Sequence, residues 1–375
     1  MPAGQPPAVT YAAAGVDVEA GDRAVELMKA AVARTHGPQV LGGIGGFAGL
    51  FDVSAIKGYR RPLLASSTDG VGTKVAIAQA LDIHDTIGFD LVGMVVDDLV
   101  VCGARPLFMT DYIACGKVVP ERIAAIVRGI AAACEQAGCA LVGGETAEHP
   151  GLIPADEYDV AGAATGVVEA DELLGPGRVR PGDVVVGLAS SGLHSNGFSL
   201  VRRVLQLGGW ALDRHVAELG RTIGEEILTP TRVYAADILD LAAALGPDLH
   251  AVSHVTGGGL AANLARVLPK PVTAVLDRST WRPAPIFDIV AGLGGVPQAD
   301  LERTLNLGVG MVCVVEADRA EDAIARLRER DLPAWVLGDV LATEAVERET
   351  TGEAVVRGAK GVDGGGVLLV GDHPR

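Results

Sequence analysis

The pattern of hydrophobic and polar positions in the first half of the chain predicts three helices and four strands. Val25, Met28 and Val32 recur at helical spacing, and Pro120 and Gly138 are typical of a helix start and a helix end. The helices are expected over 17–34, 85–102 and 120–138. The strands, which are short apolar runs, are expected over 62–68, 107–115, 139–142 and 158–168. We expect these elements to form an N-terminal domain over 15–172, preceded by a flexible arm over 1–14.

The second half of the chain begins after a polar, Pro- and Gly-rich stretch over 170–182, which predicts a domain boundary. Strands are expected over 183–190, 271–277, 308–315 and 334–341. Helices are expected over 196–207, 231–245, 258–267 and 318–330. These elements define a C-terminal domain over 173–344, and the charged, Gly-rich tail over 345–375 is left without a predicted structure or role. Because strands and helices do not alternate strictly, both domains are predicted to be α+β.

The N-terminal sheet is expected to need a partner. The strand at 160–168 is small and apolar on both faces, whereas one layer of helices covers only one face of a sheet. A second copy of the chain would cover the other face, and two such sheets could close into a barrel without exposed edges. The sequence therefore predicts a homodimer formed through the N-terminal domain.

Composition narrows the class of protein. The formal net charge of -16 disfavours nucleic acid and anionic membranes as partners, and a phosphate-bearing substrate would need a locally positive or metal-bridged site. The five cysteines form no CxxC pair, which argues against a disulfide framework or a zinc site. No signal peptide pattern and no apolar run of membrane-spanning length is found, so we expect a soluble cytoplasmic protein.

The segment 67–74, STDGVGTK, combines the groups that a metal–phosphate complex requires. Asp69 offers a carboxylate, Gly70 and Gly72 allow exposed backbone N–H groups, and Thr73 and Lys74 add a hydroxyl and a cation. The Walker A pattern is absent. The alternative is an ordinary turn with solvated charges.

Three acidic residues lie in the apolar helix expected over 85–102. Asp90 and Asp97 are seven residues apart and so share a face, whereas Asp98 points about 100° away. Carboxylates in such a helix are costly unless they are paired or bind a metal. We favour a role linked to metal or phosphate, and capping or a buried salt bridge is the alternative.

Three further loops carry candidate polar groups. In 141–151 a strand is expected to run into a Gly-Gly turn that exposes Glu145 and Thr146, although a plain polar loop would have the same pattern. The segment 190–198, SSGLHSNGF, is expected to lie between a strand and a helix. Helix capping would explain its serines and asparagine but not His194, which is a candidate general acid or base. In 253–263 a run of glycines opens a helix, and His254 is expected to be a core histidine.

Two other sites are rejected. The Gly-rich stretch 42–49, GGIGGFAG, matches the dinucleotide fingerprint loosely, but no apolar strand precedes it and the residues after it start a helix poorly. No GxSxG elbow is present, so Ser–His–acid catalysis is not expected.

Taken together, the ordered motifs resemble the AIR synthetase family, whose enzymes close the imidazole ring in purine biosynthesis with ATP. The similarity extends to about residue 341 and is carried by GFAGLFD, DGVGTK, DY, GGETA, SGLHSNG, HVTGGGL and NLGVGM in order and spacing. Two positions differ: Asp97 stands where the family often has Asn, and His149 where it often has Met. The resemblance implies a C-terminal α/β sandwich, a homodimer, the substrates ATP and formylglycinamidine ribonucleotide, the cofactor Mg²⁺ and activation by K⁺.

The resemblance also implies roles for individual residues. It implies that His194 and Asp69 are catalytic. It implies that the metal ligands are Asp69, Asp97, Asp98 and Glu145. ATP binding falls to Lys29, Gly70, Gly72, Thr73 and Lys74. Substrate binding falls to Thr146, Ser191, Ser195, Asn196, Gly257 and Gly258. The alternatives within the same fold are selenophosphate synthetase, thiamine-phosphate kinase, a hydrogenase-maturation dehydratase and formylglycinamidine ribonucleotide synthase. The alternative from another class of protein is a nucleotide-binding scaffold without turnover.

Overall fold

The computed structural model describes residues 15–349, 354–358 and 361–374, and the predicted flexible arm lies outside them. The N-terminal domain contains a four-stranded sheet in the order β3-β6-β4-β5. Its strands are β3 (Pro62–Gly70), β4 (Arg105–Cys115), β5 (Ala140–Glu148) and β6 (Tyr158–Glu169). Only β4 and β5 run parallel. All four predicted strands are present, and each is longer than the apolar run that predicted it.

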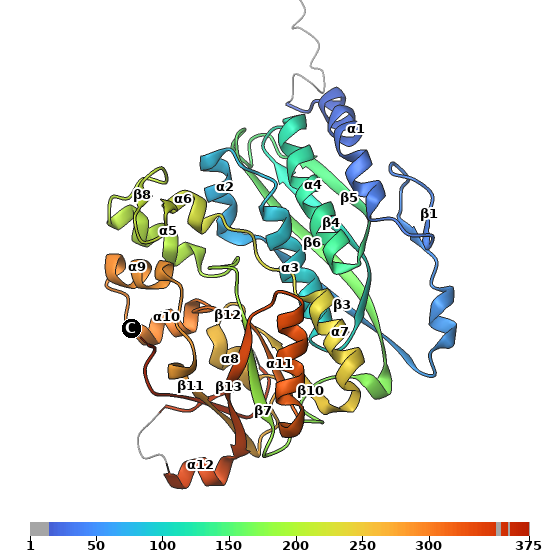
Figure 1. Ribbon diagram of the computed structural model, residues 1–375. Helices are drawn as coiled ribbons and strands as arrows, with labels where there is room; N and C mark the ends of the chain where they lie inside the picture. The colour runs from blue at the N-terminus through green and yellow to red at the C-terminus, as the bar shows by residue number, and fades with distance from the viewer. Residues whose placement is uncertain (1–14, 350–353, 359–360, 375) are drawn as a thin grey trace, which may run out of the picture.

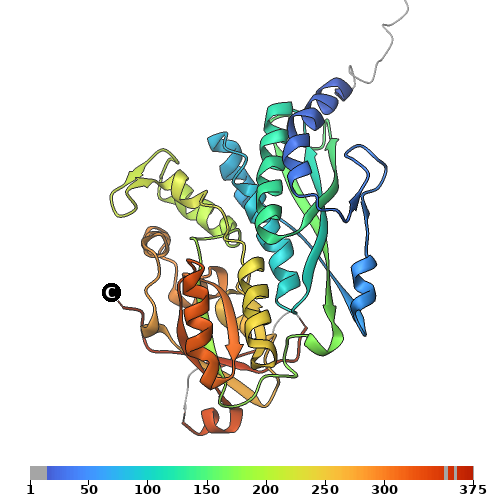
Figure 2. The same ribbon diagram turned by 45° about the vertical axis from the view of Figure 1, so that its right-hand side comes forward.

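Three helices form a layer on one face of this sheet (Figures 1 and 2). They are α1 (Val18–Arg34), α3 (Ile87–Val100) and α4 (Pro120–Ala137). Helices α3 and α4 can cross closely because Gly88 has no Cβ. A Cβ at this position would overlap the backbone of Gly129 and Ile130. The face predicted for the first helix is partly wrong: Ala24 and Ala31 are buried, whereas Val25 is 37% exposed.

No helix among the described residues covers the opposite face of the sheet, which we call the open face (Figure 2). Side chains alternate along the strands, so Ala161 and Ala163 of β6 point to this face and are exposed. Leu64 of β3 is 68% exposed there, and Tyr112 of β4 is 43% exposed. Part of the face is contacted by Phe51, whose ring centroid lies 5.4 Å from that of Phe108.

The predicted Gly-Gly turn after residue 142 is wrong, because β5 continues without a turn to Glu148. Gly144 pairs with Asp111 of β4, and a Cβ on Gly144 would overlap the Asp111 carboxylate. Glycine is therefore needed here for close approach within a strand, not for a turn.

The C-terminal domain contains a curled seven-stranded sheet in the order β10-β12-β7-β13-β11-β15-β14. The predicted strands are observed as β7 (Val184–Ala189), β11 (Val272–Asp277), β12 (Val309–Val315) and β13 (Ala334–Ala342). The unpredicted strands are β10 (Leu249–His254), β14 (Val356–Arg357) and β15 (Gly366–Val370). Strand β15 pairs with β11 in parallel, so the tail that had no predicted structure contributes to this sheet.

Helices cover both faces of this sheet. The predicted helices are observed as α5 (Phe198–Leu207), α7 (Ala235–Leu245), α8 (Gly259–Ala265) and α11 (Ala320–Glu329). Further helices of this half of the chain are α6 (Ile223–Ile227), α9 (Pro285–Gly294), α10 (Gln298–Thr304) and α12 (Thr343–Glu349). Helix α2 (Val75–Leu81) belongs to the N-terminal half, where it follows β3. Figure 1 shows α7 and α11 side by side, with α7 next to α3 of the N-terminal domain.

Two short hairpins complete the fold. One is formed by β1 (Val40–Leu41) and β2 (Leu50–Phe51), and the other by β8 (His215–Val216) and β9 (Arg221–Thr222). The Gly-rich stretch 42–49 is the connection of the first hairpin and leads into no helix, in contrast to a dinucleotide-binding loop.

One hydrophobic core extends through both domains. It joins Leu91 and Leu99 of α3 and Ile130 of α4 to Leu241 of α7 and Leu327 of α11. A second, smaller core lies on the other side of the C-terminal sheet, under α8. The shared core fixes the two domains against each other, and thereby the loops that meet between them. Within the described part of the chain, no helix is both long enough and apolar enough to span a membrane.

Candidate active site between the domains

A cleft of about 620 Å³ lies where the two domains meet. Its N-terminal wall is the loop after β3 together with Met94 of α3 and the first residues of β6. Its C-terminal wall is the loop before α5, with Thr304. The lining residues used below are Asp69, Gly70, Gly72, Thr73, Ser195 and Asn196.

The loop after β3 presents Asp69 and two glycines to this cleft. Asp69 is exposed, and its Oδ1 accepts a hydrogen bond of 2.7 Å from the Gly70 N–H. Gly72 has φ +74, a conformation that favours glycine, and nothing described lies within 4 Å of where its Cβ would be. The Thr73 hydroxyl lies 3.2 Å from that of Ser199 across the cleft. A phosphate group could approach this backbone closely.

Lys74, by contrast, points away from the cleft. Its side chain is fully buried, and its ammonium donates to Asp90 at 2.8 Å, to the His194 carbonyl at 2.9 Å and to the Thr229 carbonyl at 2.7 Å. All three donor positions of the ammonium are used by these oxygens. We had expected Lys74 to contact a nucleotide phosphate. In the structure its ammonium instead faces oxygens of the protein.

The three acidic residues of α3 have three different environments. Asp90 is paired with Lys74 and also accepts from the Thr231 hydroxyl at 2.5 Å, which is the buried salt bridge we had taken as the alternative. Asp97 is fully buried and accepts from the Tyr234 N–H at the start of α7 at 3.0 Å. Asp98 is exposed, and its Oδ1 lies 3.0 Å from Nδ1 of His254.

Two groups of this cluster have pKa values above their usual ones, for different reasons. Burial raises the pKa of Asp97 to about 7, against the opposing effects of the His254 charge and the Tyr234 N–H. Burial alone would lower the pKa of His254, but the hydrogen bond with Asp98 and the charges of Asp97, Asp98 and Asp69 raise it above its usual value. His254 is thus buried as we expected, yet it is paired with Asp98 rather than being an inert core residue.

His194 is held in a strained backbone conformation, with φ +61. Its Nε2 accepts from the Ser191 N–H at 3.1 Å, so the proton of a neutral ring is on Nδ1. That Nδ1 is buried and has no hydrogen-bond partner among the described residues. Burial, then the charges of His254, Lys74 and Arg232, lower the pKa of His194 well below its usual value. The ring is therefore a neutral N–H donor at pH 7.

The neighbouring loop residues join the two walls. The Ser195 hydroxyl donates to the Val71 carbonyl at 2.6 Å, and the Asn196 amide lies 3.2 Å from the Met94 sulfur. A Cβ on Gly257 would lie 3.3 Å from Oδ1 of Asn196, so the glycines before α8, Gly257 and Gly258, are next to this loop. The Ser191 hydroxyl donates to the Pro230 carbonyl and is turned away from the cleft lining.

Three expected site residues lie elsewhere in the subunit. Lys29 is on the exposed side of α1, where it pairs with Glu26 at 3.7 Å. Glu145 of β5 is exposed and is in register with Tyr112, which places it on the open face and not beside Asp69. Thr146, the next residue along the strand, points to the helix-covered face.

Several residues that hold the site were not predicted. Thr229, Thr231 and Tyr234 come from the segment between α6 and α7. The helix predicted over 231–245 begins only at Ala235, so Thr231 and Tyr234 lie before it. Asn306 accepts from the Ser190 hydroxyl and the Gly308 N–H and donates to the Gly192 carbonyl, and so fixes the start of the His194 loop. The NLGVGM motif could have indicated Asn306, whereas no local signal identifies the threonines.

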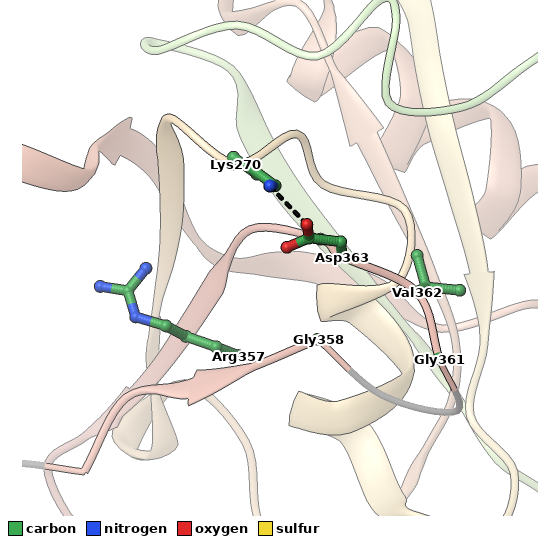
Figure 3. A pocket seen from close by; sticks show the side chains of 7 residues that line it. Lys270, Arg357, Gly358, Gly361, Val362 and Asp363 are labelled. Atoms are coloured by element: carbon green, nitrogen blue, oxygen red, sulfur yellow. Dashed lines mark ion pairs between the residues drawn. The ribbon is translucent and has the colours of Figure 1, made fainter.

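A second hollow, near the C-terminus, carries no comparable chemistry (Figure 3). Its lysine, Lys270, is paired with Asp363, and its Arg357 pairs with Glu347 at 2.7 Å. Among residues that the structure describes, no group of three or more His, Cys, Asp or Glu side chains is gathered in a form that could hold a metal ion.

Two domains of this kind with a shared cleft define an AIR synthase-type architecture. The family model "AIR synthase related protein, N-terminal domain" matches residues 52–168, and "AIR synthase related protein, C-terminal domain" matches residues 180–350. The chain is 51% identical over 336 residues to the phosphoribosylformylglycinamidine cyclo-ligase of Shouchella clausii (strain KSM-K16), covering 89% of this chain and 96% of the relative. It is 48% identical over 335 residues to that of Pseudothermotoga lettingae, covering 89% and 98%. The chain belongs to the phosphoribosylformylglycinamidine cyclo-ligase (AIR synthetase) family.

Solved structures of other enzymes share the fold. Thiamine-monophosphate kinase from Stenotrophomonas maltophilia K279a superposes with a TM-score of 0.63 at 21% identity, over 94% of this chain and 97% of that one. The hydrogenase maturation protein HypE in complex with ATP has a TM-score of 0.61 at 19% identity, over 95% and 96%. At this level of identity the likeness concerns the fold alone.

Proposed function

We propose that the chain is the ATP-dependent ligase that converts formylglycinamidine ribonucleotide to aminoimidazole ribonucleotide, with release of ADP and phosphate, in purine biosynthesis. The observation that carries this proposal is the interdomain cleft: the DGVGTK and SGLHSNG motifs meet there in a chain that matches its cyclo-ligase relatives over about nine-tenths of its length. No competing reaction is favoured by a described side chain.

The nucleotide phosphates are assigned to the N-terminal wall of the cleft. Gly72 leaves its backbone open to a close approach, Gly70 lines the same wall, and Thr73 adds a hydroxyl. Lys74 is left out of the phosphate site because its ammonium is enclosed by protein oxygens. Lys29 stays a prediction for ATP binding, to be tested in the dimer.

The residues present fit Mg²⁺ shared with the nucleotide. Asp69 and Asp98 are exposed and each uses one carboxylate oxygen in a described hydrogen bond, which leaves the other for a metal that takes its remaining ligands from phosphate and water. When bound there, Mg²⁺ would neutralise charge on the transferred phosphoryl group. Asp97, which we had expected as a ligand, is buried against α7, and Glu145 would reach such a site only from another subunit. Activation by K⁺ also remains part of the proposal.

The chemistry follows from the poor reactivity of an amide carbonyl. Attack of the formamide oxygen on the γ-phosphorus of ATP forms an imidate phosphate and releases ADP. The amidine nitrogen then attacks the carbon of the imidate phosphate, the carbon–oxygen bond breaks, and phosphate leaves with the former formyl oxygen.

The chain contributes alignment of the reacting groups and neutralisation of their charge. His254 offsets phosphoryl charge when it is protonated, which its raised pKa favours, and the neutral His194 orients a substrate oxygen or nitrogen. Ser195, Asn196, Gly257 and Gly258 form the substrate side.

A homodimer completes the proposal. The open face carries exposed apolar and small side chains on β3, β4 and β6, and a second copy facing it would form the barrel. The acidic composition, with a net charge of -16, supports small-molecule substrates without nucleic acid or membrane partners. The odd number of cysteines without a CxxC pair supports a cytoplasmic location.

The experiment that tests the proposed function measures ADP release by the purified chain with ATP, Mg²⁺ and K⁺, with and without formylglycinamidine ribonucleotide. Release that depends on this substrate supports the ligase. ATP binding without substrate-dependent ADP release would instead indicate a nucleotide-binding scaffold and contradict the proposal.

A further inference from the structure

The Lys74 ammonium lies in a cage of oxygens that come from both domains. Asp90 of α3 belongs to the N-terminal domain, whereas the His194 and Thr229 carbonyls belong to two different segments of the C-terminal domain. The distances of 2.7 to 2.9 Å are those of charge-assisted hydrogen bonds. The ring of Phe198 lies 5.4 Å from the ammonium and closes the cage on another side.

The carbonyl that Lys74 holds belongs to the one strained residue of the substrate-side loop. His194 has φ +61, and such a conformation in a residue other than glycine persists only when its surroundings enforce it. The Lys74 ammonium binds this backbone from one side, and the Ser191 N–H binds the imidazole Nε2 from the other. Together they determine where the unpartnered Nδ1–H is directed.

The Asp90 carboxylate extends the same contact. It accepts from both the N–H and the hydroxyl of Thr231, at 3.1 and 2.5 Å, in addition to the ammonium. A single ion pair from the N-terminal domain therefore fixes two segments of the C-terminal domain, 191–197 and 229–231. Loss of either charge alone would leave the other buried and unpaired.

We propose that Lys74 is a positioning residue, an internal tethered cation that holds His194 in its left-handed conformation and aligns the substrate loop with the phosphate loop. This role differs from binding phosphate, because the ammonium is fully buried and all three of its donor positions are used by protein oxygens. Where activity is the readout, the inference rests on the proposed ligase function.

The first test separates positioning from simple stability. Lys74→Met leaves the Asp90 charge unpaired and should lower both the melting temperature and kcat. The double variant Lys74→Met with Asp90→Asn removes both charges, and the new amide can still accept from Thr231. It should recover most of the lost thermal stability while kcat stays on the order of 100-fold below wild type, with KM for ATP changed little, because His194 is misaligned. If kcat returns together with stability, Lys74 is only a structural residue and the proposal is overturned.

The second test replaces the tethered cation with a free one. In Lys74→Ala the cage should accept methylammonium, which should raise both kcat and the melting temperature of the variant. Tetramethylammonium has no N–H donors and should do neither at equal ionic strength. An equal response to both ions, or to neither, would overturn the proposal.

Two controls complete the design. Lys57→Met removes an exposed lysine outside the cleft and should be unaffected by either ion. If wild type itself shows no turnover, the proposed function fails, but the methylammonium-dependent melting temperature of Lys74→Ala still decides whether the cage binds a cation as inferred.

Discussion

At the scale of single residues, Asp69 has the most direct proposed role, because its carboxylate is exposed at the phosphate wall of the cleft. Asp69→Asn should lower kcat/KM by at least ~100-fold, since it removes the carboxylate that we propose as a metal ligand and so loses transition-state stabilisation. Its melting temperature should stay within a degree or two of wild type, on the order of what a surface substitution causes. Steady-state kinetics at saturating Mg²⁺ measures the effect. An Asp69→Asn enzyme of normal activity would move the metal site to Asp98.

A second residue, Asp111, gives the protein a pH-dependent stability. Burial raises the pKa of Asp111 from its usual 3.8 to about 7, against the effect of its own backbone N–H. Between these two values the folded state keeps a proton that the unfolded state releases, so this contribution to stability is present at low pH and is lost as pH rises through about 7.

Asp111→Asn removes that titration. The melting temperature of wild type relative to Asp111→Asn should therefore fall between pH 5 and pH 8, and thermal scans of both proteins at the two values measure it. A difference that is constant, or that grows with pH, would show that Asp111 is ionised throughout this range in the folded protein.

Residue types allowed the site to be predicted in part. Asp69, Gly70, Gly72, Thr73, Ser195 and Asn196 were identified by their chemistry and all line the cleft. Lys74 was predicted to contact phosphate because a sequence shows a charge but not the direction of its side chain, which here leads to Asp90. His254 was taken as a core residue because its partner, Asp98, is 156 positions away.

At the scale of elements, the fit of α3 against α4 depends on glycine. Gly88→Ala should destabilise the protein by ~1–3 kcal/mol or more, because its Cβ would overlap the backbone of α4 and the helices would have to separate. Gly21→Ala is the matched control: it lies in α1 with nothing described within 4 Å of the new Cβ, and should stabilise the chain by ~0.5–1 kcal/mol. Denaturant unfolding of both variants compares them. Equal effects would mean that α3 and α4 do not approach each other at Gly88.

Elements with strong local signals were predicted well. Helix α4 has Pro120 in its first turn and Gly138 at its C-terminal end with φ +66. Its apolar positions at helical spacing are all buried: Ile123, Ile126, Val127, Ile130 and Cys134. Strand β10 was missed although every one of its residues is buried, because a buried strand of six residues has no alternation. Strand β15 was missed because its pairing with β11 joins residues more than 90 positions apart.

At the scale of the whole molecule, the open face should bring two chains together. Wild type should sediment at twice 38.4 kDa at micromolar concentration. Ala163→Arg places a charge at the centre of this face, between Thr68 and Thr110, and should shift the equilibrium to monomer because the charge would be buried. Ala30→Arg, on the exposed side of α1, is the control and should stay dimeric. A wild-type monomer with full activity would refute the dimer.

The central claim concerns the reaction itself, and one isotope measurement tests it most directly. Formylglycinamidine ribonucleotide labelled with ¹⁸O in the formyl group is turned over with unlabelled ATP, and the product and the released phosphate are analysed by mass spectrometry. The account predicts aminoimidazole ribonucleotide and phosphate in equal amounts, with the ¹⁸O transferred to the phosphate because the formyl oxygen leaves attached to phosphorus. Unlabelled phosphate, or no imidazole product from the folded protein, would contradict it.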